Sequence, residues 1–471
     1  MNFYVNGEWI GKDLQAIDVV NPATGDTVDQ VPKGGEREAK AAVDAAYAAF
    51  PEWSAKTAHE RSELLEAWHA LIERDQESLA KTMTEEQGKP LKEASGEIGY
   101  ANSFIKWYAE EGKRVYGETI PPSAADKRLF VIKQPVGVVA AITPWNFPAA
   151  MITRKLAPAL AVGCTTVLKP SSQTPLTALK LVELAEEAGI PKGVINVVTG
   201  SSSEISEAWQ KDSRVRKLTF TGSTEIGKQL MSGASETMKK LSLELGGHAP
   251  LIVTKDADLD LAVEQAVSSK FRNGGQTCVC ANRILVAEEV EEAFLDKFAE
   301  AVSSLVVGKG LDENTDIGPL IDDDAVDKVL NHLKDAKEKG ARVVYGGNRL
   351  DGQIVEPTII AGVTDNMVCM IEETFGPLAP VSTFKTESEA IERANATPFG
   401  LAAYLFTENL SRAIQLAEKL EYGIVGVNDG GPSVAQAPFG GWKESGIGRE
   451  GGHHGIEEFL ETKYISVKLS K

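Results

Sequence analysis

The sequence predicts an α/β protein built around a doubly wound parallel sheet. Two short, continuous apolar runs, Val136–Ile142 and Val194–Val198, have the length expected of strands buried on both faces, and a helical segment follows each. Val215–Thr221 predicts a further strand, which leads through Gly222 into another helix. Because strands and helices alternate in this way, the strands are expected to lie parallel, with helices on both faces of the sheet.

Helices are predicted before and between these strands. Glu36–Phe50 and Glu60–Glu86 carry apolar residues three and four positions apart, with charges between them, so the amino-terminal third is expected to be mainly helical. A helix is predicted over Ala149–Ala161. Another is predicted to begin at Thr174-Pro175, because a capping residue is followed by a first-turn proline, and to end near Gly189.

The carboxyl-terminal segment differs from the rest of the chain. Tyr464, Ile465, Val467 and Leu469 lie among polar residues in a roughly alternating pattern. This pattern predicts a terminal strand with one face to bury. Another subunit is one candidate for covering that face.

Length and charge narrow the class of protein. A chain of 471 residues is too long for one hydrophobic core, so two large domains with smaller accessory elements are expected. Lysine and arginine number 49 against 68 acidic residues, and the net charge of −19 disfavours nucleic acid or an anionic membrane as the main partner. Apolar runs fall short of the roughly 20 residues that a membrane-spanning helix needs.

The amino end and the cysteine usage favour a cytoplasmic protein. The first ten residues lack the basic-then-apolar pattern of a signal peptide. Four cysteines in so long a chain do not make a disulfide framework, which favours a reducing compartment. Histidines and cysteines do not cluster with the spacing of zinc ligands, so no metal is predicted.

The stretch Phe271–Arg283 contains a candidate nucleophile. Cys278 follows the flexible Gly274-Gly275 pair and lies among polar amides, between Arg272 and Arg283. A thiol attacks as its thiolate, which a polar, partly open setting flanked by cations favours. The alternative is a buried small hydrophobic residue, the usual state of a free cysteine. The stretch by itself leaves both interpretations open.

Two other positions suit acid–base and oxyanion chemistry. In Leu241–Leu245 the leucines share one face and Glu244 lies on the other, so the carboxylate can be aimed into a cleft, where partial loss of water raises its pKa toward that of a general base. Asn146 lies in the proline-bounded turn Pro144–Pro148, which suits a fixed amide donor. The alternatives are a surface glutamate and an asparagine placed for the turn itself.

Two loops at predicted strand ends suit a phosphate or a ribose. Gly222–Gly227 follows a strand and begins a helix, where small residues let backbone N–H groups approach a pyrophosphate, although the pattern is not the G-x-G-x-x-G fingerprint. Lys169–Ser172 ends another predicted strand, where α/β sheets bind their ligands. A structural turn and a solvated lysine are the alternatives.

Taken together, these motifs resemble the NAD(P)-dependent aldehyde dehydrogenase family over nearly the whole chain. Several ordered motifs at compatible separations carry the resemblance: Tyr4–Trp9, Pro144–Pro148, Lys169–Ser172, Phe220–Gly227, Glu244–Gly247, Gly275–Cys278, Asp316–Leu320, Glu373–Pro377 and Pro438–Gly441.

The resemblance implies roles for particular residues. Cys278 would be the nucleophile, Glu244 the general base that activates water, and Asn146 a donor to the oxyanion. Lys169 would bind the adenosine ribose and Ser223 the pyrophosphate. The full set of implied cofactor-binding residues is Trp145, Lys169, Ser172, Gly222, Ser223, Gly227, Leu245, Glu373 and Phe375.

Ser172 bears on the choice between NADP and NAD. Strongly NAD-selective relatives often carry glutamate at this position, where the acid binds ribose hydroxyls and repels a 2′-phosphate. Serine removes that repulsion, and nearby Lys169 would attract the phosphate. The enzyme is therefore expected to accept NADP, with NAD as a further possibility.

The substrate is predicted at a finer level. The segment Gln276–Asn282 resembles the succinate-semialdehyde branch, which also places arginines at Arg154 and Arg272 and a serine at Ser433. Two guanidinium groups suit a short aldehyde with a remote carboxylate, which arginine binds in a bidentate fork. Either arginine is alternatively a structural ion-pair residue, and glutarate semialdehyde or a broad range of aldehydes is the competing substrate class.

Cys280 follows the proposed nucleophile by two positions. A Cys278–Cys280 disulfide would form a strained, easily reduced ring and would act as a reversible redox switch. The alternative is a buried companion thiol.

The resemblance also implies an architecture. A dinucleotide-binding domain would comprise residues 1–118 and 135–246, and a catalytic domain residues 247–445. A small β bridging element would combine residues 119–134 and 446–471 and would pair strands between subunits, giving a homodimer or homotetramer. Three alternative classes remain. The cofactor motifs count against a cysteine hydrolase, and Glu244, placed to activate water, counts against a CoA-acylating dehydrogenase. The intact reactive residues count against a non-catalytic relative.

Overall fold

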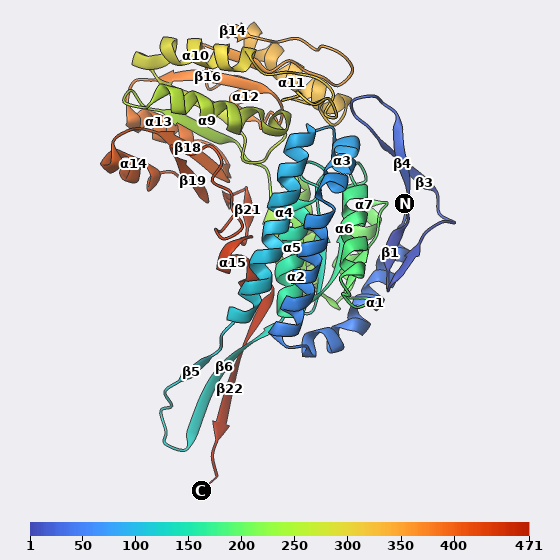
Figure 1. Ribbon diagram of the computed structural model, residues 1–471. Helices are drawn as coiled ribbons and strands as arrows, with labels where there is room; N and C mark the ends of the chain where they lie inside the picture. The colour runs from blue at the N-terminus through green and yellow to red at the C-terminus, as the bar shows by residue number, and fades with distance from the viewer. Residues whose placement is uncertain (471) are drawn as a thin grey trace.

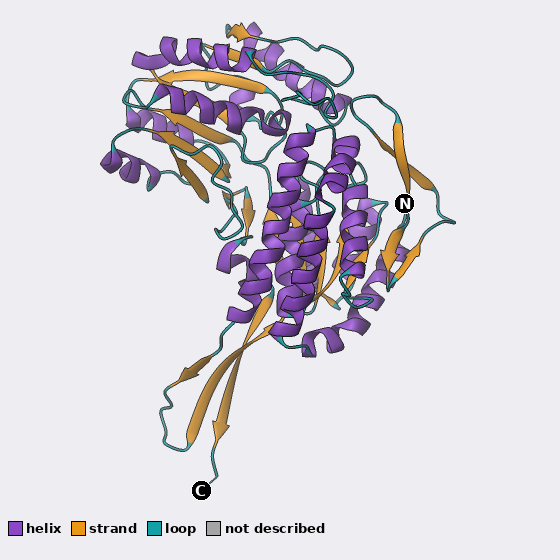
Figure 2. Cartoon of the chain, viewed as in Figure 1, coloured by secondary structure: helices purple, strands orange, loops and turns teal. Residues whose placement is uncertain are grey.

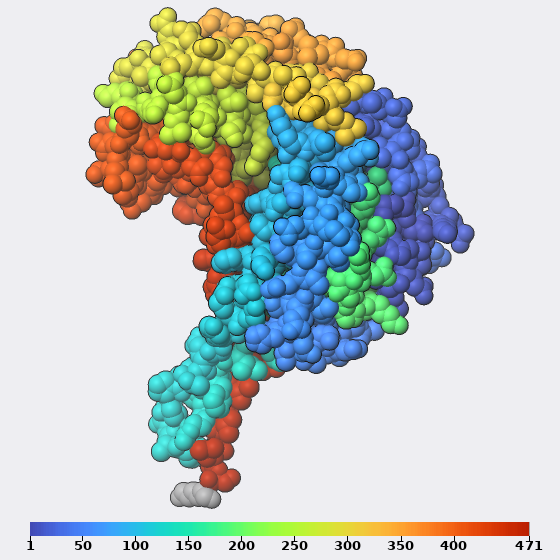
Figure 3. All heavy atoms as spheres, viewed as in Figure 1, coloured from blue at the N-terminus to red at the C-terminus, as the bar shows by residue number. Residues whose placement is uncertain are grey.

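The computed structural model describes residues 1–470 and contains two α/β lobes and a slender arm (Figure 1). Within these residues the lobes are built on a six-stranded and a seven-stranded sheet, and the arm on three strands. Helices lie against the sheets in both lobes (Figure 2). The two lobes are in contact and the arm projects away from them (Figure 3). The predicted α/β class is confirmed.

The sheet of the first lobe is doubly wound, as predicted. Its strand order in residues 1–470 is β21-β11-β10-β7-β8-β9, with all neighbours parallel except β21. The chain runs outward from β7 through β8 to β9 and then returns to β10 on the other side of β7, so the order reverses between β7 and β10. Ligands bind at such a reversal. The strands are β7 (Val138–Ile142), β8 (Thr165–Lys169), β9 (Ile195–Val197), β10 (Val215–Thr221), β11 (Lys240–Glu244) and β21 (Gly446–Ile447).

Helices cover this sheet and supply most of the first hydrophobic core. They are α1 (Glu36–Ala55), α2 (Ala58–Arg74), α3 (Gln76–Gln87), α4 (Leu91–Glu111), α5 (Ala150–Val162), α6 (Leu176–Glu187), α7 (Ser202–Lys211) and α8 (Thr224–Ala234). The expectation of one helix over Glu60–Glu86 is wrong, because Asp75 ends α2 and begins α3. The apolar spacing continues across this break, so periodicity did not reveal it. Arg74 Nε lies 2.8 Å from Asp75 Oδ1 at this junction.

The amino terminus and the short turns complete this lobe. The amino-terminal third also contains strands that the helical periodicity did not predict: β1 (Phe3–Val5), β2 (Glu8–Ile10), β3 (Ala16–Val20) and β4 (Thr27–Pro32). Short 3-10 segments lie at Gly112–Arg114, Ser235–Thr237, Arg272–Gly275 and Glu288–Val290.

The second lobe has the strand order β14-β15-β16-β13-β12-β18-β19 in the described residues, parallel throughout except for β14. Leu251 and Val253 of β12 face one hydrophobic core and Ile252 faces another, as expected of a strand buried on both faces. The strands are β12 (Ala249–Val253), β13 (Ala281–Ala287), β14 (Arg342–Tyr345), β15 (Thr358–Ala361), β16 (Leu378–Phe384), β18 (Ala402–Phe406) and β19 (Ile424–Val427).

The sheet separates these two cores, and helices cover both of its faces. They are α9 (Leu259–Phe271), α10 (Glu291–Ser303), α11 (Asp323–Glu338), α12 (Val368–Ile371), α13 (Glu387–Asn395) and α14 (Leu410–Ala417). A small antiparallel pair, β17 (Phe399–Gly400) and β20 (Trp442–Lys443), lies outside the main sheet.

The arm contains the predicted terminal strand. β22 (Leu460–Lys468) pairs antiparallel with β6 (Lys127–Pro135) along its whole length, and β5 (Glu118–Ile120) pairs with the other edge of β6. The segment 446–471, expected to belong wholly to the bridging element, is divided between the first lobe and the arm. Its β21 extends the sheet of the first lobe, and its α15 (Gly452–Glu457) packs on α4 and α5. Lys471 lies outside the described residues.

Candidate active site

Site residues gather at one edge of the first sheet because four neighbouring parallel strands end there. Glu244 is the last residue of β11, Thr221 of β10 and Lys169 of β8. The turn that carries Asn146 follows β7. The carboxyl ends of parallel strands meet at the same edge, so motifs separated by up to a hundred positions lie next to one another.

Two cavities meet at Cys278. One has a volume of about 310 Å³ and the other of about 350 Å³, and both are lined by Cys278 and Met151. The first also contains Arg154 and Arg272, and the second contains six of the nine residues expected to bind a dinucleotide. The thiol is therefore placed between two binding spaces.

Backbone geometry brings Cys278 to this junction. Gly275 has φ +77°, and a Cβ there would lie 2.3 Å from the carbonyl oxygen of Gly376. A Cβ at Gly247 would lie 2.2 Å from the carbonyl oxygen of Cys278. Only glycine permits these approaches, so Gly275 and Gly247 serve fixed geometry rather than flexibility.

The charge environment of Cys278 differs in two ways from the expectation. Burial raises the pKa of its thiol to about 12, and the guanidinium groups of Arg154 and Arg272 offset this rise only in part. Arg283 is not one of the flanking cations, because its guanidinium binds the carbonyl oxygens of His248, Arg393 and Ala394 in the second lobe.

Glu244 is buried at the strand end, with 2% of its surface exposed. Neither carboxylate oxygen has a hydrogen-bond partner among residues 1–470. Loss of water and the nearby Glu450 carboxylate raise its pKa well above the ordinary value, while Arg154 and Lys155 oppose the rise. The interpretation as a surface strand glutamate is wrong, and an unpartnered carboxylate of raised pKa has the properties of a general base.

Asn146 is held from both its side chain and its backbone. Its Nδ2 donates to the carbonyl oxygen of Gln276 at 3.0 Å, and its own carbonyl accepts from Lys89 Nζ at 2.7 Å and from Asn273 Nδ2 at 3.0 Å. Lys89 is in turn paired with Glu97, and both are buried. A side-chain amide has two N–H groups, so one remains for a substrate oxygen.

The second cavity combines a helix amino terminus, a buried carboxylate and an aromatic surface. Ser223 caps the amino terminus of α8, where first-turn N–H groups attract a pyrophosphate. Glu373 accepts from the Gly247 N–H at 3.0 Å, and burial raises its pKa to about 7. Phe375, with φ +55°, meets the Trp145 ring edge-on at 5.7 Å and supplies a flat apolar surface.

The other expected cofactor residues are placed as follows. Gly222 and Leu245 line the second cavity. Gly227 does not line it; a Cβ there would lie 2.4 Å from Leu245 Cδ2, so its small size lets Leu245 pack. Lys169 and Ser172 also lie outside the cavity lining, on the same sheet edge, and Ser172 Oγ donates to the Gly200 carbonyl at 3.3 Å. Burial lowers the pKa of Lys169 to about 8.

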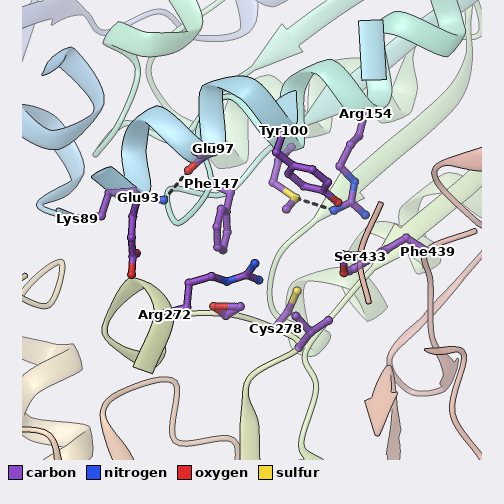
Figure 4. Close-up of a pocket in the computed structure, with 14 residues that line it drawn as sticks. Lys89, Glu93, Glu97, Tyr100, Phe147, Arg154, Arg272, Cys278, Ser433 and Phe439 are labelled. Carbon is purple, nitrogen blue, oxygen red and sulfur yellow. Dashed lines mark hydrogen bonds and ion pairs between the residues drawn. The ribbon is translucent and has the colours of Figure 1, made fainter. Parts of the chain in front are cut away.

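The first cavity brings the two arginines and Ser433 together with Cys278 (Figure 4). The arginines differ in their surroundings. Arg272 is exposed, packs 5.4 Å from the centre of the Phe147 ring, and forms no ion pair with any residue that the structure describes. Arg154 is 1% exposed, lies 3.9 Å from the centre of the Phe439 ring, and pairs with Glu450. Arg154 therefore forms a structural ion pair and also lines the cavity, whereas Arg272 lines the cavity alone.

Several residues of the site were not predicted. Tyr100 and Phe439 line the first cavity, and Lys155 contacts both Glu450 and the Thr221 hydroxyl. The spacing of Glu93, Glu97 and Tyr100 along one face of α4 was a signal that could have identified the cavity wall. Glu450 gave no comparable signal.

Cys280 is fully buried and does not line either cavity. Its Sγ accepts from Lys270 Nζ at 3.2 Å, and Lys270 also donates to Asn282 Oδ1 at 3.0 Å. All four cysteines are free thiols within the described chain. The arrangement is that of a buried thiol with a cationic neighbour.

Comparisons with known proteins identify the family. The model of the aldehyde dehydrogenase family matches residues 9–465. The chain is 58% identical over 467 residues to a glutarate-semialdehyde dehydrogenase of Pseudomonas putida, covering 99% of this chain and 97% of that protein. It is likewise 58% identical, over 468 residues and with the same coverage, to the succinate-semialdehyde dehydrogenase (NADP(+)) GabD of Escherichia coli.

A solved structure agrees with the sequence comparisons. The crystal structure of an E. coli NADP-dependent enzyme superposes with a TM-score of 0.98 at 58% identity, covering 99% of this chain and 98% of that chain. No helix within residues 1–470 combines the length and the apolar character that crossing a membrane requires. The chain belongs to the aldehyde dehydrogenase family and is an NAD(P)-dependent oxidoreductase that acts on aldehydes.

Proposed function

We propose that this enzyme oxidises succinate semialdehyde, or a similar short aldehyde with a remote carboxylate, to the corresponding dicarboxylic acid. One observation carries the proposal: the cavity that opens on Cys278 also contains two guanidinium groups, Arg154 and Arg272. A carboxylate in so small a space is favoured where cations compensate for its loss of water. The similarity to a succinate-semialdehyde dehydrogenase supports the same substrate.

Cys278 and Asn146 act in the first step of the proposed mechanism. The Cys278 thiolate attacks the aldehyde carbon, and the C–S bond forms as the carbonyl π electrons move to oxygen, giving a thiohemiacetal. The free N–H of the Asn146 side chain and the Cys278 backbone N–H stabilise the oxyanion. Losing one such donor typically slows a reaction by about 10²–10³-fold. A nicotinamide bound in the second cavity would serve as the acceptor for the hydride that leaves this carbon, and Cys278 would then hold the acyl group as a thioester.

Glu244 acts in the second step. Its carboxylate takes a proton from water, the hydroxide attacks the thioester carbon, and the C–S bond breaks to release the acid and the Cys278 thiolate. Its raised pKa supports this role, because a base must bind the proton that it removes. This assignment also separates the enzyme from a CoA-acylating dehydrogenase, in which CoA would take the place of water.

We propose NADP as an accepted cofactor, with the residues implied by the resemblance as its ligands. Ser172 carries no negative charge to repel a 2′-phosphate, and Lys169 lies three residues away. Ser172→Glu is expected to lower kcat/KM for NADP while sparing NAD. Equal effects on both cofactors, or no detectable use of NADP by the parent, would contradict the assignment.

We propose a homodimer or homotetramer in the cytoplasm. The arm exposes apolar side chains that a second copy would cover, including Tyr464 at 58% and Val467 at 38% exposure. The four free thiols support a reducing compartment. Light scattering on the purified protein measures its mass, and a monomer at micromolar concentration would contradict the oligomer.

One assay tests the proposed activity. Reduced nicotinamide is followed by absorbance with succinate semialdehyde, glutarate semialdehyde and butanal, each with and without CoA. We expect the highest kcat/KM with succinate semialdehyde and no dependence on CoA, and we expect Cys278→Ser to abolish turnover. A higher kcat/KM with glutarate semialdehyde would favour the competing substrate, to which the Pseudomonas relative corresponds by name. Full turnover by Cys278→Ser would overturn the mechanism.

A further inference from the structure

We propose that the phenolic hydroxyl of Tyr100 is a third donor to the remote carboxylate of the substrate and thereby determines specificity for carboxylated aldehydes. This inference rests on the proposed function and extends it to a residue of α4, an element that the motifs of the sequence did not implicate.

Helical spacing places Tyr100 in the cavity wall. Glu93, Gly96, Glu97 and Tyr100 all line the first cavity, and positions separated by three, four and seven residues share one face of a helix. A Cβ at Gly96 would meet no atom within 4 Å, so this position leaves open space beside the tyrosine. The face of α4 therefore forms a wall with room in front of the Tyr100 ring.

Aromatic packing fixes the direction of the hydroxyl. The Tyr100 ring meets Phe104, one turn further along α4, edge-on at 5.0 Å and 75°. The Arg154 guanidinium in turn lies 5.6 Å from the centre of the Phe104 ring. The hydroxyl of Tyr100 is directed toward that guanidinium (Figure 4). The phenol and the guanidinium are thus held by the same phenylalanine.

Some hydrogen-bond donors around the cavity have no partner within the described protein. Arg154 Nη2 has no hydrogen-bond partner within residues 1–470, although it is buried. Arg272 approaches the cavity from the opposite wall (Figure 4). A carboxylate accepts at about four lone-pair sites, so it can satisfy two guanidinium groups and one hydroxyl together. Donors from α4, α5 and the turn before Cys278 then enclose the carboxylate.

Tyr100 is suited to donate at neutral pH. Burial raises the pKa of its phenol above the ordinary value, although Arg154 and Arg272 oppose the rise. The hydroxyl therefore keeps its proton and remains neutral, so it does not repel an anionic substrate. A hydrogen bond from a neutral donor to a charged acceptor is stronger than one between two neutral groups.

Tyr108 provides a matched comparison on the same helix. It lies about two turns further along α4, is fully buried, and does not line the cavity. A Cβ at Gly455 would lie 2.2 Å from the Tyr108 hydroxyl oxygen, which shows how closely the backbone of α15 covers it. Removing its hydroxyl tests the structural effect of such a change at a position outside the cavity lining.

The experiment compares Tyr100→Phe with Tyr108→Phe on two four-carbon substrates, succinate semialdehyde and butanal, in the intact enzyme. For Tyr100→Phe we expect kcat/KM for succinate semialdehyde to fall by about 10- to 100-fold, mainly through KM, with butanal unchanged. The inhibition constant of succinate against butanal oxidation should rise by a similar factor. For Tyr108→Phe we expect the ratio of the two substrates to stay as in the parent.

Each other outcome contradicts the inference. An unchanged succinate-semialdehyde KM in Tyr100→Phe, or an equal loss on both substrates, would show that the hydroxyl does not bind the carboxylate. If Tyr108→Phe changed the substrate ratio as much, the effect would belong to the packing of α4. Failure of the proposed function is separately visible, because the parent enzyme would then oxidise butanal but not succinate semialdehyde.

Discussion

The Nε atom of Arg154 lies 2.8 Å from Oε2 of Glu450, in a contact where both side chains are buried. The atoms form an ion pair without the alignment of a hydrogen bond. Lys155 binds the same carboxylate from the neighbouring position of α5. Arg154 therefore belongs both to the wall of the substrate cavity and to a buried charge cluster that influences Glu244. Arg272 has no such second role.

This difference predicts different effects of replacing the two arginines with lysine. Arg272→Lys removes a bidentate donor from the cavity, so KM for succinate semialdehyde should rise by about 10- to 100-fold with butanal unaffected. Arg154→Lys should raise KM similarly. It should also lower the melting temperature, because the buried negative charge of Glu450 loses part of the ion pairing that stabilises it. Steady-state kinetics and thermal unfolding of both variants provide the measurement. An equal loss on both substrates with Arg272→Lys would argue against a carboxylate clamp.

Glu244→Gln is expected to stop the enzyme at the thioester. The amide cannot take a proton from water, so turnover should fall by about 10²–10⁴-fold while the first burst of reduced nicotinamide remains. Stopped-flow absorbance measures the burst, and intact-protein mass spectrometry detects the acylated Cys278. The control is Cys278→Ser, which should show neither signal. Loss of the burst in Glu244→Gln would place Glu244 in the first step instead.

Asn146→Ala is expected to slow the burst itself. The variant loses a donor to the oxyanion, which typically costs about 10²–10³-fold in rate. Its backbone carbonyl keeps its bonds to Lys89 and Asn273, so the fold should remain intact. Single-turnover kinetics measures the rate, and circular dichroism checks the fold. A slow release of the acid after a normal burst would contradict the oxyanion role.

The thiol of Cys278 should become more reactive as pH rises. Burial raises its pKa to about 12, so the protonated thiol predominates at neutral pH and the thiolate fraction grows with each step upward. Iodoacetamide alkylation of Cys278 in the cofactor-free enzyme should therefore accelerate by roughly tenfold per pH unit across the neutral and mildly alkaline range. Peptide mass spectrometry follows the modification. A plateau near neutral pH would indicate that the arginines lower the pKa more than burial raises it.

Cys280→Ala separates the two interpretations of the second thiol. Because Cys280 is buried against Lys270, we expect the variant to lose activity to peroxide, and to recover it with a dithiol, in the same way as the parent. A sulfenic acid on Cys278 would account for reversible loss without Cys280. Recovery in the parent but not in the variant would establish a Cys278–Cys280 disulfide switch.

The sequence by itself determined the alternation of strands and helices, the doubly wound sheet and the strand ends that carry Glu244, Asn146 and Lys169. These features depend on local patterns: continuous apolar runs, helical spacing and the residues that cap or end an element. Where a pattern continued through a break, as at Asp75, the prediction failed.

Only the tertiary structure decided which charges meet at the site. Lys155 and Glu450 are 295 positions apart, and Arg283 is five residues from Cys278 yet faces another part of the second lobe. It also placed Tyr100 in the cavity wall and left the Glu244 carboxylate without a hydrogen-bond partner among residues 1–470. Local periodicity gives the face of an element on which a side chain lies, whereas the packing of elements from distant segments gives its neighbours, its loss of water and therefore its pKa.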